Sequence, residues 1–68
     1  MTNHYVVKLR VWSVGGYSLT KGDAITILQR NTEAKTLLVD NIYFEHPVWV
    51  FVDDFVIHCE ENTTIQPS

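Results

Sequence analysis

The residues whose chemistry could support catalysis or metal binding are few and scattered. His58 and Cys59 are adjacent, and residues 56–59 have the β-branched composition of a strand. Because neighbouring side chains of a strand point to opposite faces, this pair is poorly placed for catalysis or chelation. The other histidines, His4 and His46, show no spacing typical of a zinc site. We therefore expect no metal and no cofactor, and we interpret Cys59 as a small apolar residue.

Asp53 and Asp54 are adjacent carboxylates in a predicted turn. Two successive side chains in a turn do not aim at one substrate atom without special geometry. An acid–base pair also needs a pocket that sets the two pKa values apart. We interpret Asp53 as the cap of a short helical turn over residues 53–55. The sequence therefore does not predict an enzyme.

Alternating apolar residues predict strands along most of the chain. The predicted strands are residues 5–12, 24–29, 36–39, 42–44, 48–52 and 56–59, separated by polar or Gly-rich turns. In the first of them, the residues expected to face inward are Tyr5, Val7, Leu9 and Val11, with Lys8, Arg10 and Trp12 on the outer face. Because no segment has a helical period, we expect an all-β fold, a small five- to six-stranded barrel. The predicted domain is 1–60, followed by a flexible polar tail, 61–68.

The turn Lys21-Gly22-Asp23 runs directly into an alternating strand. Gly22 can adopt the positive φ of a tight turn, and Asp23 can bond the backbone there. Residues 19–28, Leu-Thr-Lys-Gly-Asp-Ala-Ile-Thr-Ile-Leu, resemble the diverging turn and following strand of Src-homology-3 domains. Residues 50–56 resemble the fourth strand, helical turn and start of the last strand of that family. The resemblance implies a Src-homology-3-like barrel.

The same comparison argues against the proline-peptide groove of that family. Residues 9–13 lack the tyrosines of its first-strand motif, and residues 36–39 lack its tryptophan. Residues 53–55 contain neither the proline nor the tyrosine of its helical turn. We therefore transfer no binding residue from the family and do not expect polyproline recognition.

Charge and aromatic content favour a protein partner. The net charge is −3, all five basic residues lie before Thr36, and no basic residue follows it. An acidic surface of this kind attracts basic protein surfaces and repels nucleic acid. The eight aromatic residues exceed what one small core can bury fully, and exposed Trp and Tyr are common at interfaces. The predicted partner-binding residues are Trp12, Tyr17, Tyr43, Trp49, Asp53 and Asp54. The alternative is that these aromatics are half-buried packing and the charges are simply solvated.

These observations leave three functions open. The first is a small non-enzymatic protein-binding module; its size suggests a phage or mobile-element protein that binds and inhibits a host protein. The second is a nucleic-acid-binding barrel that uses Lys8, Arg10 and Trp12 on one strand face. The third is a structural subunit of a homo-oligomer or larger assembly, joined through an apolar strand edge.

Cellular location follows from cysteine usage and hydropathy. A single cysteine excludes an internal disulfide, and each apolar run is far shorter than the roughly 20 residues of a membrane helix. The N-terminus, Met1-Thr2-Asn3-His4, has no basic region followed by an apolar run. We expect a cytoplasmic protein with no membrane partner.

Overall fold

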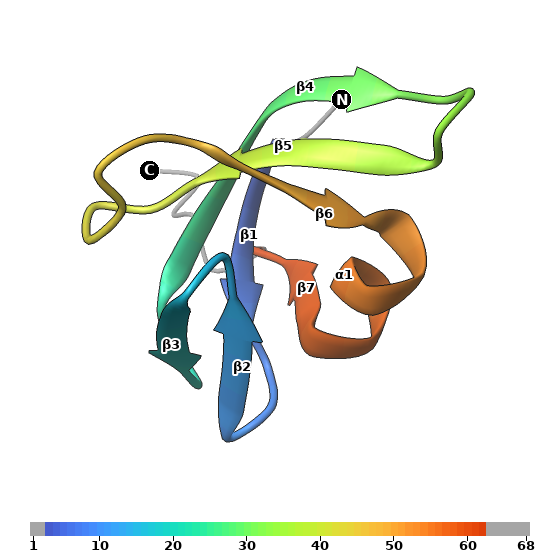
Figure 1. Ribbon diagram of the computed structural model, residues 1–68. Coiled ribbons are helices and arrows are strands. Elements are labelled where there is room, and N and C mark those ends of the chain that lie inside the picture. Colours follow the sequence, from blue (N-terminus) through green and yellow to red (C-terminus); the bar gives the residue numbers. More distant parts are fainter. Residues whose placement is uncertain (1–2, 63–68) are drawn as a thin grey trace, which may run out of the picture.

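Two antiparallel sheets and one short helix make up the fold (Figure 1). The computed structural model describes residues 3–62. The strands are β1 (His4–Val7), β2 (Val11–Val14), β3 (Tyr17–Thr20), β4 (Ala24–Asn31), β5 (Thr36–Asp40), β6 (Val48–Phe51) and β7 (Cys59–Glu61), and the helix α1 is Val52–His58. Five strands form one sheet in the order β6-β5-β4-β1-β7, and β2 and β3 form a separate hairpin. The predicted predominance of strands is confirmed.

The strand pairing does not close into a barrel within the described residues. β6 and β7 stand at opposite edges of the larger sheet, and the β2–β3 hairpin is paired with neither of them. In the lower part of Figure 1, β3, β2, β7 and α1 follow one another from left to right. The fold is therefore an open arrangement of two sheets with a helix.

Glycines with positive φ angles form both turns around β3. Gly15 and Gly16 have φ angles of 56° and 87°, and they join Val14 directly to Tyr17. Two successive positive φ angles are typical of the tight hairpin turn that matches strand twist. At the next turn, Gly22 has a φ of 97°, and the Asp23 Oδ2 accepts the Thr20 N–H at 2.8 Å. The predicted turn at Lys21-Gly22-Asp23 is confirmed.

The prediction of one continuous strand over residues 5–12 is wrong, because strand β1 ends at Val7 and β2 begins only at Val11. The Val7 N–H donates to Asp23 O, and Val7 O accepts the Gly22 N–H. Lys8 then donates its N–H to His58 O rather than continuing along β4. Beyond Val7 the burial is therefore the reverse of the predicted pattern: Leu9 and Val11 are exposed, and Trp12 is 1% exposed.

The segment between β5 and β6 is a loop, so the predicted strand over residues 42–44 is wrong. Asn41 is buried, and its amide donates to Ala24 O at 2.6 Å. Its Oδ1 accepts the Tyr43 N–H at 2.8 Å, and its carbonyl accepts the Phe44 N–H. Local bonds from an Asn side chain compete with strand pairing. They fold residues 41–44 into a turn and bury Phe44.

Residues 52–58 form a helix of two turns rather than a single turn followed by a strand. The N-cap is Phe51, with no side-chain cap bond, so the predicted capping role of Asp53 is wrong. Val56 and Ile57 lie on the exposed side of α1, whereas Phe55 is buried. Val56 therefore does not begin the last strand.

The last strand begins at Cys59 and pairs with β1, matching Tyr5 with Glu61. The first residue of the predicted tail, 61–68, thus belongs to a strand. Asn62 continues this pairing with an N–H donated to His4 O at 3.0 Å. Residues 63–68 of the predicted tail lie outside the described residues.

One hydrophobic core joins all of these elements. Every strand and the helix contribute at least one buried or half-buried side chain, and Trp12, Leu19, Ile25, Val7 and Val39 are the largest of those fully buried. Phe55 of α1 contacts Tyr5 and Trp12 edge to face, with ring centroids 5.0 and 6.0 Å apart. In residues 3–62, no helix is long and apolar enough to cross a membrane.

Candidate protein-binding surface

Alternation along β6 places two aromatic rings in solvent. Val50 is buried and Val48 is half-buried, whereas Trp49 is 48% exposed and Phe51 is 68% exposed. The sequence left open which face of this strand points inward, and the structure answers that question. The predicted partner-binding residue Trp49 therefore lies on the surface.

The helix that follows β6 adds acidic and aliphatic side chains beside these rings. Asp53 and Asp54 lie in the first turn of α1 and are exposed, and Ile57 is 57% exposed in the second turn. We name the residues Trp49, Phe51, Asp53, Asp54 and Ile57 the β6–α1 surface. It contains three of the six predicted partner-binding residues.

Phe51 separates two hollows of this surface. One is a groove between β2 and β6, lined by Ser13, Val14, Gly15, residues 48–51 and Asp54. The other lies between α1 and the β4–β5 turn, lined by Ala34, Lys35, Phe51, Asp53, Asp54 and Ile57. Phe51 and Asp54 line both hollows. An exposed ring between two depressions offers a partner both a protruding group and places for its own side chains.

Asp54 is held in place from β2. The Trp12 Nε1–H donates to the Asp54 Oδ2 at 2.8 Å, and the His58 Nδ1 lies 3.4 Å from the Asp54 Oδ1. The His58 ring stacks on the Trp12 indole, with centroids 5.5 Å apart and planes 13° apart. These contacts fix α1 to the hairpin and orient one of the two surface carboxylates.

Trp12 itself is not part of this surface. Its side chain is only 1% exposed, so the expectation that it lies on the outer face is wrong. The physical reason is that β1 ends at Val7, so the alternation of inward and outward side chains in β1 does not continue into β2. Lys8 and Arg10 are exposed between these strands, and Trp12 is not beside them as a stacking platform.

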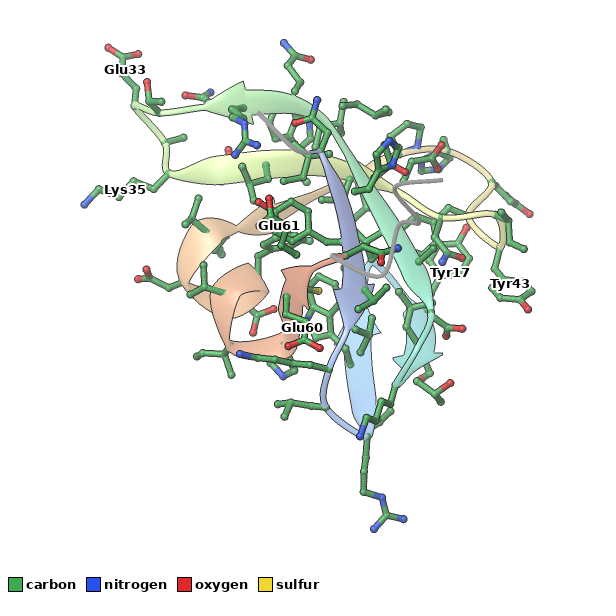
Figure 2. All side chains as sticks on the ribbon, turned by 180° about the vertical axis from the view of Figure 1, so that it is seen from behind. Tyr17, Glu33, Lys35, Tyr43, Glu60 and Glu61 are labelled. Atoms are coloured by element: carbon green, nitrogen blue, oxygen red, sulfur yellow. The ribbon has the colours of Figure 1, made fainter. Side chains whose placement is uncertain are left out.

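Tyr17 and Tyr43 belong to another region. Figure 2 shows both on the opposite side of the view from Lys35, which borders Phe51. Tyr17 is half-buried, stacks on Phe44 at a centroid distance of 4.5 Å, and accepts the Glu45 N–H at 2.9 Å. Its contacts are those of a packing residue. Tyr43 is 64% exposed but is separated from the β6–α1 surface.

Cys59 is buried in the core, as expected of an apolar thiol. Its side chain is 4% exposed, and burial together with the nearby Asp54 charge raises the pKa of the thiol from 9.0 to about 12, although Lys8 acts in the opposite direction. A thiol with this pKa is protonated at neutral pH and is a poor nucleophile. Over the described part of the chain, no group of three His, Cys, Asp or Glu side chains could hold a metal ion.

Two members of the β6–α1 surface were not predicted from the sequence. Phe51 could have been found from its alternation with Val50 and Val52, which implies the same face as Trp49. Ile57 could not, because residues 56–59 have the composition of a strand.

Comparison of the chain with protein-family models, curated proteins and solved structures finds no match.

Proposed function

We propose that the protein is a non-enzymatic protein-binding module that engages its partner through the β6–α1 surface. The observation that carries the proposal is Phe51, a ring 68% exposed between two hollows. Covering a large apolar ring with a partner removes it from water and lowers the free energy, and aromatic residues dominate the binding energy of many interfaces. Trp49 and Ile57 extend this apolar area on either side.

Charge defines the partner further. Asp53 and Asp54 line the second hollow together with Phe51. Lys35 is the one cation among the residues that line the two hollows. With a net charge of −3 over the chain, a partner with Lys or Arg near an apolar contact is favoured. We propose that this partner is a host protein that a phage or mobile-element product binds and inhibits.

We propose further that the two sheets form a Src-homology-3-like barrel that stays open where no strand pairing joins the β2–β3 hairpin to the larger sheet. A turn with a positive-φ glycine leads into β4, and β6, α1 and β7 follow one another in the order that the resemblance implies. Such a scaffold supports binding through exposed loops and strand edges, without a catalytic pocket.

The test is partner capture from native lysate by tagged wild type and two alanine variants. Phe51→Ala removes the exposed ring, and Ile42→Ala is the matched control because Ile42 is 87% exposed in the β5–β6 loop. Neither residue is in the core, so both variants should fold, which circular dichroism checks. We expect Phe51→Ala to weaken capture about thirtyfold, as for an interface hot spot of about 2 kcal/mol, and Ile42→Ala to have no effect. Equal capture by both variants would exclude this surface.

Self-association is the second candidate, because β6 is an edge strand with uncharged side chains. Edges of this kind can pair with a second copy of the same chain. Light scattering at increasing concentration separates the two functions. A dimer that Phe51→Ala converts to a monomer would favour self-association, and a monomer at all concentrations would exclude it.

A further inference from the structure

The register between β5 and β6 leaves backbone groups of β6 facing outward. The Val52 N–H donates to Lys35 O at 2.9 Å, and the pairs Phe51–Thr36, Val50–Leu37 and Trp49–Leu38 follow in order. Hydrogen-bonded and non-hydrogen-bonded pairs alternate in an antiparallel ladder. Val50 therefore bonds with Leu37, and Trp49 and Phe51 direct their N–H groups away from β5. The Trp49 carbonyl points the same way, and within residues 3–62 these three groups have no hydrogen-bond partner.

These groups border the groove between β2 and β6. Ser13 of β2 and residues 48–51 of β6 line its two walls. The hairpin tip closes one end, because Gly15 lies so near Val48 that an added Cβ would be 2.7 Å from the Val48 Cγ1. Asp54 of α1 also lines the groove. The free edge of β6 thus lies along a groove with an acidic side.

The two edges of the larger sheet differ in their protection. β7, at the other edge, has only three residues, and Glu60 and Glu61 are exposed there (Figure 2). Exposed charges are a common means of preventing an edge strand from pairing, and charge rather than length separates the two edges, because β6 has four residues. β6 has neither charge nor proline, and it exposes Trp49 and Phe51. Of the two edges, β6 is the one suited to pairing.

We infer that the β6–α1 surface binds an extended, basic segment of its partner by strand addition to β6. The inference rests on the proposed protein-binding function and specifies its mode. The segment accepts hydrogen bonds from the Trp49 and Phe51 N–H groups and donates one to the Trp49 carbonyl. An apolar side chain of the segment covers Phe51, and a Lys or Arg lies beside Asp53 and Asp54. The acidic net charge disfavours a second copy of this chain as the occupant.

The test compares two substitutions at Phe51 that differ in the backbone. Phe51 has φ −75° and ψ 143°, a conformation that proline adopts without strain, and Val50 before it lies in the β region. Phe51→Ala removes the ring and keeps the N–H group, whereas Phe51→Pro removes both. Because that N–H is not used in the β5 ladder, Phe51→Pro should fold as Phe51→Ala does.

The probe is a display library of random peptides about ten residues long, enough to span an ordinary strand. Peptides enriched on wild type should alternate apolar residues with Lys or Arg. Their affinity, measured by fluorescence anisotropy, should be about fivefold lower for Phe51→Pro than for Phe51→Ala, as for one lost main-chain hydrogen bond. Hydrogen exchange of the Trp49 and Phe51 amides should slow in the complex. If Phe51→Pro does not fold, N-methylation of alternate peptide residues replaces it: one set should abolish binding and the other should not.

Each contrary result has a distinct meaning. Equal affinities for the two Phe51 variants, unchanged amide exchange, or equal effects of both N-methylated sets would overturn strand addition. Enrichment of acidic or Pro-rich peptides, or of none, would overturn the extended basic segment. In each case capture of a partner that depends on Phe51 keeps the binding module, whereas equal effects of Phe51→Ala and Ile42→Ala remove it as well.

Discussion

The hydrogen bond between Trp12 and Asp54 connects the hairpin to α1, and its contribution to stability can be measured. The indole Nε1–H donates to the Asp54 Oδ2 at 2.8 Å, from a side chain that is 1% exposed. A hydrogen bond to a charged group contributes about 1.5–3 kcal/mol when it is fully sheltered. The Asp54 side chain is 48% exposed, so water can replace part of the lost interaction. We expect a coupling of about 1 kcal/mol.

A double-mutant cycle isolates this coupling. Trp12→Phe keeps most of the buried ring and removes the donor, and Asp54→Ala removes the acceptor. The loss of ring volume at position 12 and of negative charge in the first turn of α1 occur in both arms of the cycle and cancel. Urea unfolding of wild type, both single variants and the double variant gives the four free energies. A coupling below about 0.3–0.5 kcal/mol, the usual limit of additivity, would refute a stabilising bond.

Trp12→Ala has a much larger expected effect. Removing a buried Trp typically costs about 3–5 kcal/mol, and a chain of this length has a total stability of about 3–10 kcal/mol. A large fraction of Trp12→Ala should therefore be unfolded at room temperature, as measured by circular dichroism. Loss of partner binding in that variant would report unfolding, so binding is tested at Phe51 instead.

Three further predictions concern stability. Gly15→Ala should destabilise the protein by at least about 1 kcal/mol more than Gly16→Ala in urea unfolding, since only at position 15 does the new Cβ meet Val48; equal losses would contradict this. Asn41→Ala should cost about 2 kcal/mol, because the buried amide serves two backbone groups, and a loss below about 0.5 kcal/mol would show that water replaces it. Cys59 should react with a thiol reagent at pH 8 only after denaturation, since its pKa is raised from 9.0 to about 12. The unfolded chain loses this thiol proton first, so stability should fall as the pH rises from 9 towards 12, and less steeply in Cys59→Ala; the same slope in both proteins would contradict the raised pKa.

Features controlled by local backbone chemistry were predictable from the sequence. The Lys21-Gly22-Asp23 turn and the Gly15-Gly16 reversal need only the freedom of glycine and the short side chain of Asp. The alternation in β6 likewise follows from its valines. These features place Trp49 on one face and Asp53 and Asp54 directly after it, so half of the predicted partner-binding residues come together.

Features controlled by contacts distant in sequence were not predictable. The end of β1 depends on bonds from Val7 to residues 22 and 23 and from Lys8 to His58, and these reverse the burial of Trp12. Helix α1 has seven residues and one buried side chain, Phe55, too few to reveal a helical period. Its β-branched residues favour a strand in isolation, and packing of Phe55 against Trp12 and Tyr5 overrides that preference.

The position of β1 between β4 and β7 has a consequence for the order of folding during synthesis. Of the described strands β1 is made first, yet one of its neighbours is the last of them, since Tyr5 pairs with Glu61. Until residue 61 has left the ribosome, one edge of β1 has no partner and the core lacks Phe55 and Cys59. At about 5–20 residues per second, the nascent chain spends seconds in this incomplete state. Completion of the sheet therefore requires the two ends of the described chain to meet, and contacts this far apart in sequence are typical of slow-folding β proteins.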